Sequence, residues 1–216
     1  DNVCNSACQS CNAGLSTKIG ALQSKKDFHR IDNYEVFKKL PQERIIEFDV
    51  NGGEPTASKN YKKILHDLPP NVKIVRMNTN GSRMIKEIEN VLKRNIMVIV
   101  TMSLDGIGDV HDYTRWPIKW KDYEKTVTAY QDLQEKYSLL KLDMWTTVSC
   151  LNINNLPDII AFCKNRNIPH DWAFLERPSV LSVRYKNKFT EEAKHVSPED
   201  IAIDKDNDQL LELFMK

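Results

Sequence analysis

Five short apolar segments rich in β-branched residues recur along this chain, and amphipathic segments separate them. The apolar segments, at 44–50, 72–77, 96–103, 141–149 and 168–175, are predicted strands. Helical spacing is expected at 61–68, 84–92, 123–137 and 156–166, with Ser82 as the cap of the second helix. Strands and helices that alternate at intervals of roughly 25–45 residues predict a parallel α/β protein.

Glycines and small polar residues follow three of the predicted strands. The segments are Asn51-Gly52-Gly53-Glu54-Pro55, Asn78-Thr79-Asn80-Gly81 and Ser103-Leu104-Asp105-Gly106. Right-handed crossovers place the carboxyl ends of parallel strands on one side of a sheet, where the chemistry of such folds gathers. Four of the chain's seven glycines are in these segments, which favours a site over three ordinary turns. Taken singly, each segment also fits a plain turn, and in the third segment Asp105 could cap that turn.

Three of the five cysteines, Cys4, Cys8 and Cys11, form a C-x3-C-x2-C motif. An odd count in a chain of 216 residues does not indicate a disulfide framework. The motif favours a metal or cluster in a reducing compartment, so we expect a cytoplasmic protein. Structural zinc needs a fourth ligand, and none is close by. Three thiolates on a four-iron cluster would leave one iron open to a ligand. Cys150 and Cys163 are expected to be buried apolar fillers.

Charge and hydropathy exclude two classes of partner. The chain carries 31 basic and 30 acidic side chains, so it has no bulk attraction for nucleic acid or an anionic membrane. Its apolar runs are far shorter than a membrane-spanning helix, which needs about 20 residues. We therefore expect no membrane partner and no nucleic-acid partner. The length fits a core over 1–178 and a helical extension over 179–216, where Ser197-Pro198-Glu199-Asp200 is typical of a helix start.

The order of these motifs resembles the radical S-adenosylmethionine (radical SAM) superfamily. The cysteine motif is followed by G-G-E-P, then N-T-N-G, then S-L-D-G, within residues 3–178. The run S-L-D-G-x4-H-D-Y-x-R, which ends at Arg115, and the later T-V-S-C-L-N-I-N-N-L are most similar to the branch with SPASM or twitch extensions.

The resemblance implies a partial (β/α)6 TIM-like barrel with a cluster in the loop after its first strand. Only three residues precede Cys4, so we expect that strand to be largely missing and the native chain to be longer. Cys4, Cys8 and Cys11 would hold three irons of a [4Fe–4S] cluster, and S-adenosylmethionine would chelate the fourth. The reduced cluster would cleave this cofactor to methionine and a 5′-deoxyadenosyl radical that abstracts hydrogen from a substrate.

The same resemblance implies the cofactor contacts. Gly52, Gly53, Glu54 and Pro55 would approach the methionine amino group, Ser103 and Asp105 would lie near the ribose or carboxylate, Arg115 would neutralise the carboxylate, and Asn80 belongs to the same set. A Gly-Gly turn lets carbonyls approach an ammonium, and arginine matches a carboxylate in two hydrogen bonds. A buried arginine needs the cofactor or a protein acid as its partner.

Several alternatives and departures accompany this interpretation. Arg115 could instead be a surface cation stacked on Trp116 or Trp120, and His111 is expected to be exposed or to cap a helix. Ser10 stands where the superfamily commonly has an aromatic residue. No cysteine follows Cys163, so residues 179–216 cannot hold an auxiliary cluster through thiolates.

The leading hypothesis is a radical enzyme that acts on a peptide or protein and takes electrons from a donor such as a flavodoxin or ferredoxin. The alternative is a non-catalytic iron–sulfur or zinc module for electron transfer or partner binding. Within the enzymes, a small molecule or nucleotide is the second substrate class.

Overall fold

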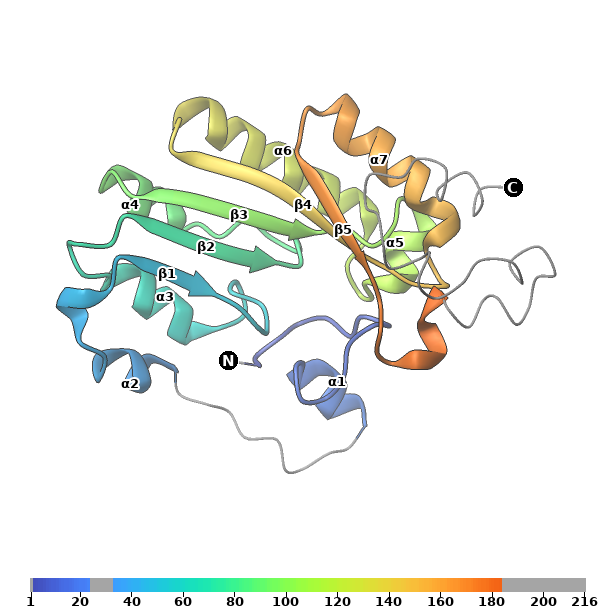
Figure 1. The fold of residues 1–216 in the computed structure, drawn as a ribbon, viewed down its shortest axis with the longest axis horizontal. Helices are drawn as coiled ribbons and strands as arrows, with labels where there is room; N and C mark the ends of the chain where they lie inside the picture. The colour runs from blue at the N-terminus through green and yellow to red at the C-terminus, as the bar shows by residue number, and fades with distance from the viewer. Residues whose placement is uncertain (1, 24–32, 184–216) are drawn as a thin grey trace.

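The computed structural model describes residues 2–23 and 33–183, and it contains one parallel sheet. The strands follow one another in the sheet in chain order (Figure 1): β1 Glu47–Val50, β2 Ile74–Thr79, β3 Met97–Ser103, β4 Leu140–Val148 and β5 His170–Phe174. This order is that of a barrel segment, because each strand is added beside the previous one by a crossover in the same direction.

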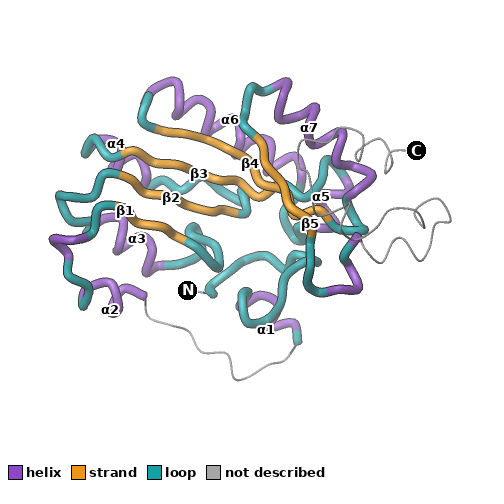
Figure 2. The backbone as a smooth tube through the Cα atoms, in the orientation of Figure 1, coloured by secondary structure: helices purple, strands orange, loops and turns teal. Residues whose placement is uncertain are grey.

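Helices cover one face of this sheet, and α1 lies apart from them, beyond the carboxyl ends of the strands beside the N-terminal loop (Figure 2). The helices are α1 Thr17–Leu22, α2 Asn33–Lys38, α3 Lys59–His66, α4 Ile88–Lys93, α5 Asp109–Thr114, α6 Trp120–Lys136 and α7 Leu156–Asn165, with 3-10 turns at Gln42–Arg44, Ile153–Asn155 and Ser179–Leu181. Helices α3, α4, α6 and α7 contribute buried side chains to the core beneath the strands. No helix in the described ranges is long and apolar enough to cross a membrane.

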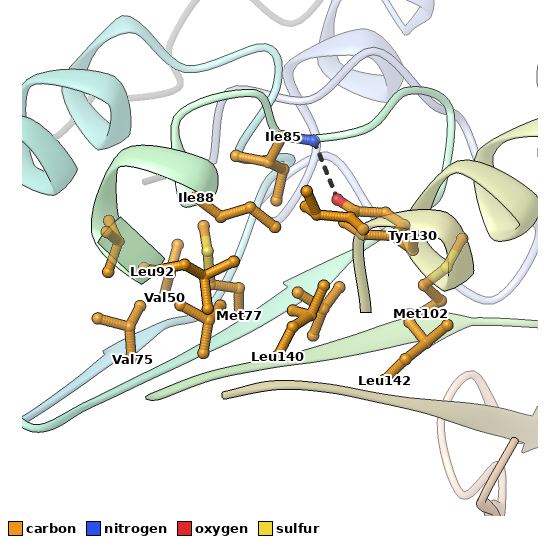
Figure 3. Close-up of a cluster of buried hydrophobic side chains, with 14 of the residues drawn as sticks. Val50, Val75, Met77, Ile85, Ile88, Leu92, Met102, Tyr130, Leu140 and Leu142 are labelled. Atoms are coloured by element: carbon orange, nitrogen blue, oxygen red, sulfur yellow. Dashed lines mark hydrogen bonds between the residues drawn. The ribbon is translucent and has the colours of Figure 1, made fainter. Parts of the chain in front are cut away.

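Buried and exposed side chains alternate along the strands, which distinguishes the two faces of the sheet. In β2, Val75 and Met77 are buried, whereas Arg76 and Asn78 are exposed. The buried set meets α4, α6 and the segment that precedes α4. In that segment the backbone N–H of Ile85 donates to the hydroxyl of Tyr130 on α6 at 3.0 Å (Figure 3). The other side of the sheet, the open face, presents Arg76, Asn78, Thr101, Asp143 and Trp145.

The five predicted strands and their parallel arrangement are confirmed. Within 2–23 no strand precedes the sheet, so the described residues contain five of the six expected strands. Four expected helices are present, but three short helices, α1, α2 and α5, were not predicted from the sequence.

The expected cap of the second helix is wrong. Helix α4 begins at Ile88 with Glu87 as its N-cap residue. Ser82 stays in the loop because its hydroxyl accepts a hydrogen bond from the side chain of Asn5, while its N–H donates to Asn80. Of the extension over 179–216, residues 184–216, with the expected helix start at 197–200, lie outside the described residues.

Candidate functional site

The cysteine loop passes along the carboxyl edge of the sheet (Figure 1). The backbone N–H of Glu54, after β1, donates to the carbonyl of Val3 at 2.8 Å. The side chain of Asn80, after β2, donates to Asn5 Oδ1 and Ser6 Oγ, both at 2.8 Å. The loop is therefore held against segments that follow two neighbouring strands.

Helix α1 holds the same loop from its other side. Ser16, the N-cap residue of α1, accepts from the N–H of Ile19 and donates to the carbonyl of Ser6 at 2.6 Å. The hydroxyl of Thr17 lies within hydrogen-bond distance of both backbone groups of Cys4. The signal for this helix was Ser16, a good N-cap residue. The segment that it starts is too short for periodicity to reveal.

The three cysteines are free and half-buried. Burial raises the pKa of Cys8 to about 11, Arg115 acts against this rise, and Asp105, Cys4 and Cys11 add to it. Burial likewise raises the pKa of Cys11, and Cys4 adds to that rise. In the described part of the chain, no three His, Cys, Asp or Glu side chains are grouped closely enough to hold a metal ion. The type of ligand does fit an iron–sulfur cluster, because such clusters are bound by cysteine thiolates and this anchored loop carries three cysteines.

Glu54 is fully buried, and its carboxylate is hydrogen-bonded by the protein. Oε1 accepts from the N–H and hydroxyl of Thr56 and from the hydroxyl of Thr79, and Oε2 accepts from the N–H of Asn80 at 2.7 Å. Burial raises the pKa of this carboxyl, and the hydrogen bonds oppose the rise. The side chain joins the ends of β1 and β2, so contact with a ligand at this turn falls to the backbone.

The turn before Glu54 requires glycine. Gly52 and Gly53 have φ values of 83° and 63°, which glycine adopts without the steric cost of a Cβ. The hydroxyl of Tyr61 donates to the carbonyls of Asn51 and Gly52 and anchors the turn on α3. Gly52 is exposed, Gly53 is half-buried, and Pro55, the last residue of the motif, is buried.

Asp105 and Arg115 form a buried ion pair beside the cysteine loop. Arg115 Nη1 donates to Asp105 Oδ2 at 2.8 Å, and the two side chains are 10% and 4% exposed, with Arg115 the more exposed. Asp105 Oδ1 accepts from the N–H of Thr147 at 2.9 Å, which ties the pair to β4. Burial alone would lower the pKa of Arg115, but the nearby Cys8 and Asp105 raise it above its usual value. The guanidinium therefore stays charged.

The alternative of a surface arginine stacked on an indole is wrong. The guanidinium is buried because Asp105 draws it inward, and the cation over the Trp116 ring is Lys18, at 5.3 Å from the ring centre. Ser103 ends β3 half-buried on the open face, in register with Trp145.

The expectation that His111 is exposed or caps a helix is also wrong. The ring is fully buried, with its centre 4.6 Å from that of Tyr123 and 5.5 Å from that of Trp120. Burial, and then the charge of Arg115, lower its pKa to about 3, so the ring is neutral. Helix α5, which the sequence pattern does not predict, turns this residue inward. Of the two remaining cysteines, Cys163 is buried as expected, whereas Cys150 is half-buried.

The structure thus brings most of the candidate residues to one edge of the sheet. The cysteine loop makes direct hydrogen bonds to Glu54, to Asn80 and to the segment around Arg115. Asn80 was expected at a cofactor, yet its amide N–H groups are used on the loop and its oxygen accepts from Ser82. Such a site holds the cysteine loop beside a buried ion pair.

Comparison with known proteins gives structural matches alone. No family model and no curated protein matches the chain. Among solved structures, native anSMEcpe with bound AdoMet and the Kp18Cys peptide matches with a TM-score of 0.59 at 19% identity, over 82% of this chain and 50% of that one. Streptococcus suis SuiB bound to the precursor peptide SuiA matches with a TM-score of 0.57 at 13% identity, over 82% and 38%.

A third match, a hexahistidine-tagged anSMEcpe with bound AdoMet, has a TM-score of 0.57 at 20% identity, over 82% of this chain and 50% of that one. The chain thus spans half or less of the length of these three structures. AnSME and SuiB are radical SAM enzymes. The resemblance found in the sequence is confirmed at the level of the fold, a parallel α/β partial barrel.

Proposed function

We propose that this chain is the core of a radical SAM enzyme that modifies a peptide or protein. The observation that carries the proposal is the anchored cysteine loop: three free, half-buried thiols lie between the glycine turn after β1 and the buried Asp105–Arg115 pair. The fold shared with solved AdoMet-bound radical SAM enzymes supports it.

Cys4, Cys8 and Cys11 are the residues that would hold a [4Fe–4S] cluster. When bound and reduced, the cluster would pass one electron to S-adenosylmethionine, giving methionine and a 5′-deoxyadenosyl radical that takes a hydrogen atom from the substrate. The electron would come from a donor such as a flavodoxin or ferredoxin. The protein's part is to hold the thiols with α1 and Asn80 and to keep their surroundings partly dry.

Residues beside the loop fit the polar groups of S-adenosylmethionine. The exposed backbone at Gly52 offers a close approach to its ammonium group. Arg115 uses Nη1 on Asp105, and its Nε–H has no hydrogen-bond partner among the described residues, so the guanidinium has donors left for a carboxylate. Ser103 supplies a hydroxyl at the same edge, and its proposed partner is the ribose or the carboxylate.

A peptide is the substrate class that the comparisons favour. Native anSMEcpe is solved with the Kp18Cys peptide and SuiB with its precursor peptide SuiA. The open face of this sheet carries exposed polar side chains, among them Arg76 and Asn78, and a half-buried indole, Trp145. Such a face offers a peptide both hydrogen bonds and an aromatic contact.

The test is anaerobic reconstitution of the protein with iron and sulfide, followed by addition of S-adenosylmethionine and dithionite. We expect bound iron and 5′-deoxyadenosine, and we expect Cys8→Ala to lose both. Cys150→Ala is the matched control and should keep both, because Cys150 lies outside the loop.

Three results would contradict the proposal and favour another function. Iron bound without 5′-deoxyadenosine, in the presence of candidate peptides, would indicate an electron-transfer or binding module. Tight binding of zinc in place of iron would indicate a zinc module. Turnover of a nucleotide or another small molecule with no peptide modification would reassign the substrate.

A further inference from the structure

We propose that His111, Tyr123 and Arg115 form a binding site for one buried water molecule, and that this water holds the Nε–H group of Arg115. The site lies where helices α5 and α6 meet, beside the Asp105–Arg115 ion pair. The inference goes beyond the proposed function, because these side chains need neither an iron–sulfur cluster nor S-adenosylmethionine in order to bind water.

Three buried side chains at this place carry polar atoms that lack a partner. Both ring nitrogens of His111, the hydroxyl of Tyr123 and the Nε–H of Arg115 make no hydrogen bond to any described residue. The exposed fractions of these residues are 0%, 0% and 8%, in the same order. The backbone of Gly106 approaches the His111 ring without the geometry of a hydrogen bond. Buried polar groups are rarely left unpaired, and ordered water is a common partner for them.

The backbone brings the three side chains together. Arg115 is the C-cap residue of α5, and its N–H donates to the carbonyl of His111, four residues earlier, at 2.9 Å. Residues at this spacing project from one face of a helix, with Cβ atoms about 5–6 Å apart. Across the contact with α6, the ring centre of Tyr123 lies 4.6 Å from that of His111. His111 therefore neighbours both of the other side chains.

The charges at the site agree with this placement. Burial, and then the charge of Arg115, lower the pKa of His111 to about 3. Burial raises the pKa of the Tyr123 hydroxyl above its usual value, and the charge of Arg115 opposes that rise. At neutral pH the imidazole is therefore uncharged and the tyrosine keeps its proton. The guanidinium is the one cation among the three side chains.

The unpaired atoms indicate a small, neutral ligand. The Nε–H of Arg115 can only donate, the hydroxyl of Tyr123 can donate or accept, and a neutral imidazole has one acceptor nitrogen. Asp105 already balances the charge of Arg115, so a charged ligand at Nε would be buried without compensation. Water fits these atoms, because it can accept from Nε–H and donate to a ring nitrogen and to the hydroxyl.

The water gives the guanidinium a second fixed point. Asp105 holds Nη1 at 2.8 Å, and the water holds Nε of the same planar group, which leaves the Nη2 group for a ligand. The hydroxyl of Tyr123 cannot move to another partner, because its ring lies so close to Gly81 that a Cβ there would be 2.4 Å from Cε2.

The direct test is a crystal structure of this chain at a resolution that shows ordered water. We expect density for one water within hydrogen-bond distance of Arg115 Nε, Tyr123 Oη and one ring nitrogen of His111. Density for an ion at this position would overturn the inference. An empty site, or a direct hydrogen bond between two of the three side chains in place of the water, would also overturn it.

A test in solution uses Tyr123→Phe, which keeps the ring and removes the hydroxyl. The water would lose one hydrogen bond, so the equilibrium constant for unfolding should rise by about three- to tenfold in urea denaturation. Removal of an unpaired buried hydroxyl would instead leave that constant unchanged or lower it. Either of these two results would overturn the inference.

Tyr130→Phe is the matched control for the solution test. Tyr130 lies on the same helix and is equally buried, and its hydroxyl accepts from the N–H of Ile85 at 3.0 Å. Its loss leaves a backbone donor unpaired, so the unfolding constant should rise at least as much as in Tyr123→Phe.

The inference and the proposed function fail separately. A protein that holds the water but makes no 5′-deoxyadenosine would overturn the proposed function alone. A protein that makes 5′-deoxyadenosine, with no water between these side chains, would overturn the inference alone.

Discussion

Glu54 joins two strand ends through one buried carboxylate. Each of its oxygens accepts from a backbone N–H, Oε1 from Thr56 and Oε2 from Asn80. The motif G-G-E-P therefore serves two purposes at neighbouring positions. Its glycines allow the positive φ values of the turn. Its glutamate hydrogen-bonds to Asn80, which in turn donates to the cysteine loop.

Glu54→Gln should lower the free energy of unfolding by about 2–4 kcal/mol. Whichever oxygen becomes NH2 will face a backbone N–H, of Thr56 or Asn80, and two donors cannot pair. Urea denaturation measures the loss. Glu47→Gln, which alters an exposed ion pair with Arg76, is the control and should cost less than about 1 kcal/mol. Equal losses would show that the carboxylate network does not stabilise the fold.

His111 should make stability depend on pH. Its pKa is about 3 in the folded protein against 6.5 as the ordinary value, so the unfolded chain binds the proton more tightly. Stability from this residue is present above pH 6.5 and is lost as the pH falls toward 3. Between about pH 6.5 and about pH 5 the loss is about 2 kcal/mol.

His111→Phe keeps an aromatic ring beside Tyr123 and Trp120 but cannot take up the proton. We expect this variant to lose about 2 kcal/mol less than the parent over that interval, as measured by urea denaturation at each pH. His170, whose pKa burial also lowers, acts equally in both proteins and cancels in the difference. Identical profiles would mean that His111 is not buried as a neutral ring.

At the scale of elements, α6 sits close against the turn after β2, and this closeness requires glycine. A Cβ built on Gly81 would lie 2.4 Å from Tyr123 Cε2 and 2.8 Å from Met102 Cε. Tyr123 is fully buried and cannot move aside. The N-T-N-G motif thus sets both a turn with positive φ and the spacing between helix and sheet.

Gly81→Ala should therefore destabilise the protein by about 2–5 kcal/mol. The φ of Gly81 is 71°, so an alanine there carries backbone strain of about 1–2 kcal/mol. The clash of its Cβ with Tyr123 and Met102 adds an overpacking cost of about 1–3 kcal/mol. Urea denaturation measures the loss, and a loss no larger than the backbone strain alone would contradict the tight packing.

At the scale of the whole molecule, the helices cover one face of the sheet and leave a polar open face. Neighbouring residues of β2 sample the two environments, because Met77 is 1% exposed beneath the helices and Asn78 lies exposed on the open face. The same strands thus supply the core on one side and the surface proposed to meet a peptide on the other.

Met77→Ala should cost about 2–5 kcal/mol in the free energy of unfolding, because it leaves a cavity in the core. Asn78→Ala should cost less than about 1 kcal/mol, because it removes one exposed hydrogen bond, to Asn51. Urea denaturation of both variants tests the assignment of the faces. A larger loss for Asn78→Ala would reverse it.

Local pattern determined the elements of this protein. Apolar runs and helical spacing predicted the five strands and four of the helices, since burial alternates or repeats within a few residues of the chain. The cysteine spacing and the glycine-containing turns were equally local, so the sequence placed them at one edge of a parallel sheet. The short helices α1 and α5 carry too few residues for such periodicity to show.

The roles of single side chains at the site were decided by tertiary structure. Asn80 meets Asn5 across 75 positions, and Asp105 meets the N–H of Thr147 across 42. His111 is buried because α6 brings Trp120 and Tyr123 over it. Such pairings depend on which loops the crossovers bring together. The sequence by itself determined which chemistry gathers at the edge, and only the fold decided that Arg115 is buried against Asp105.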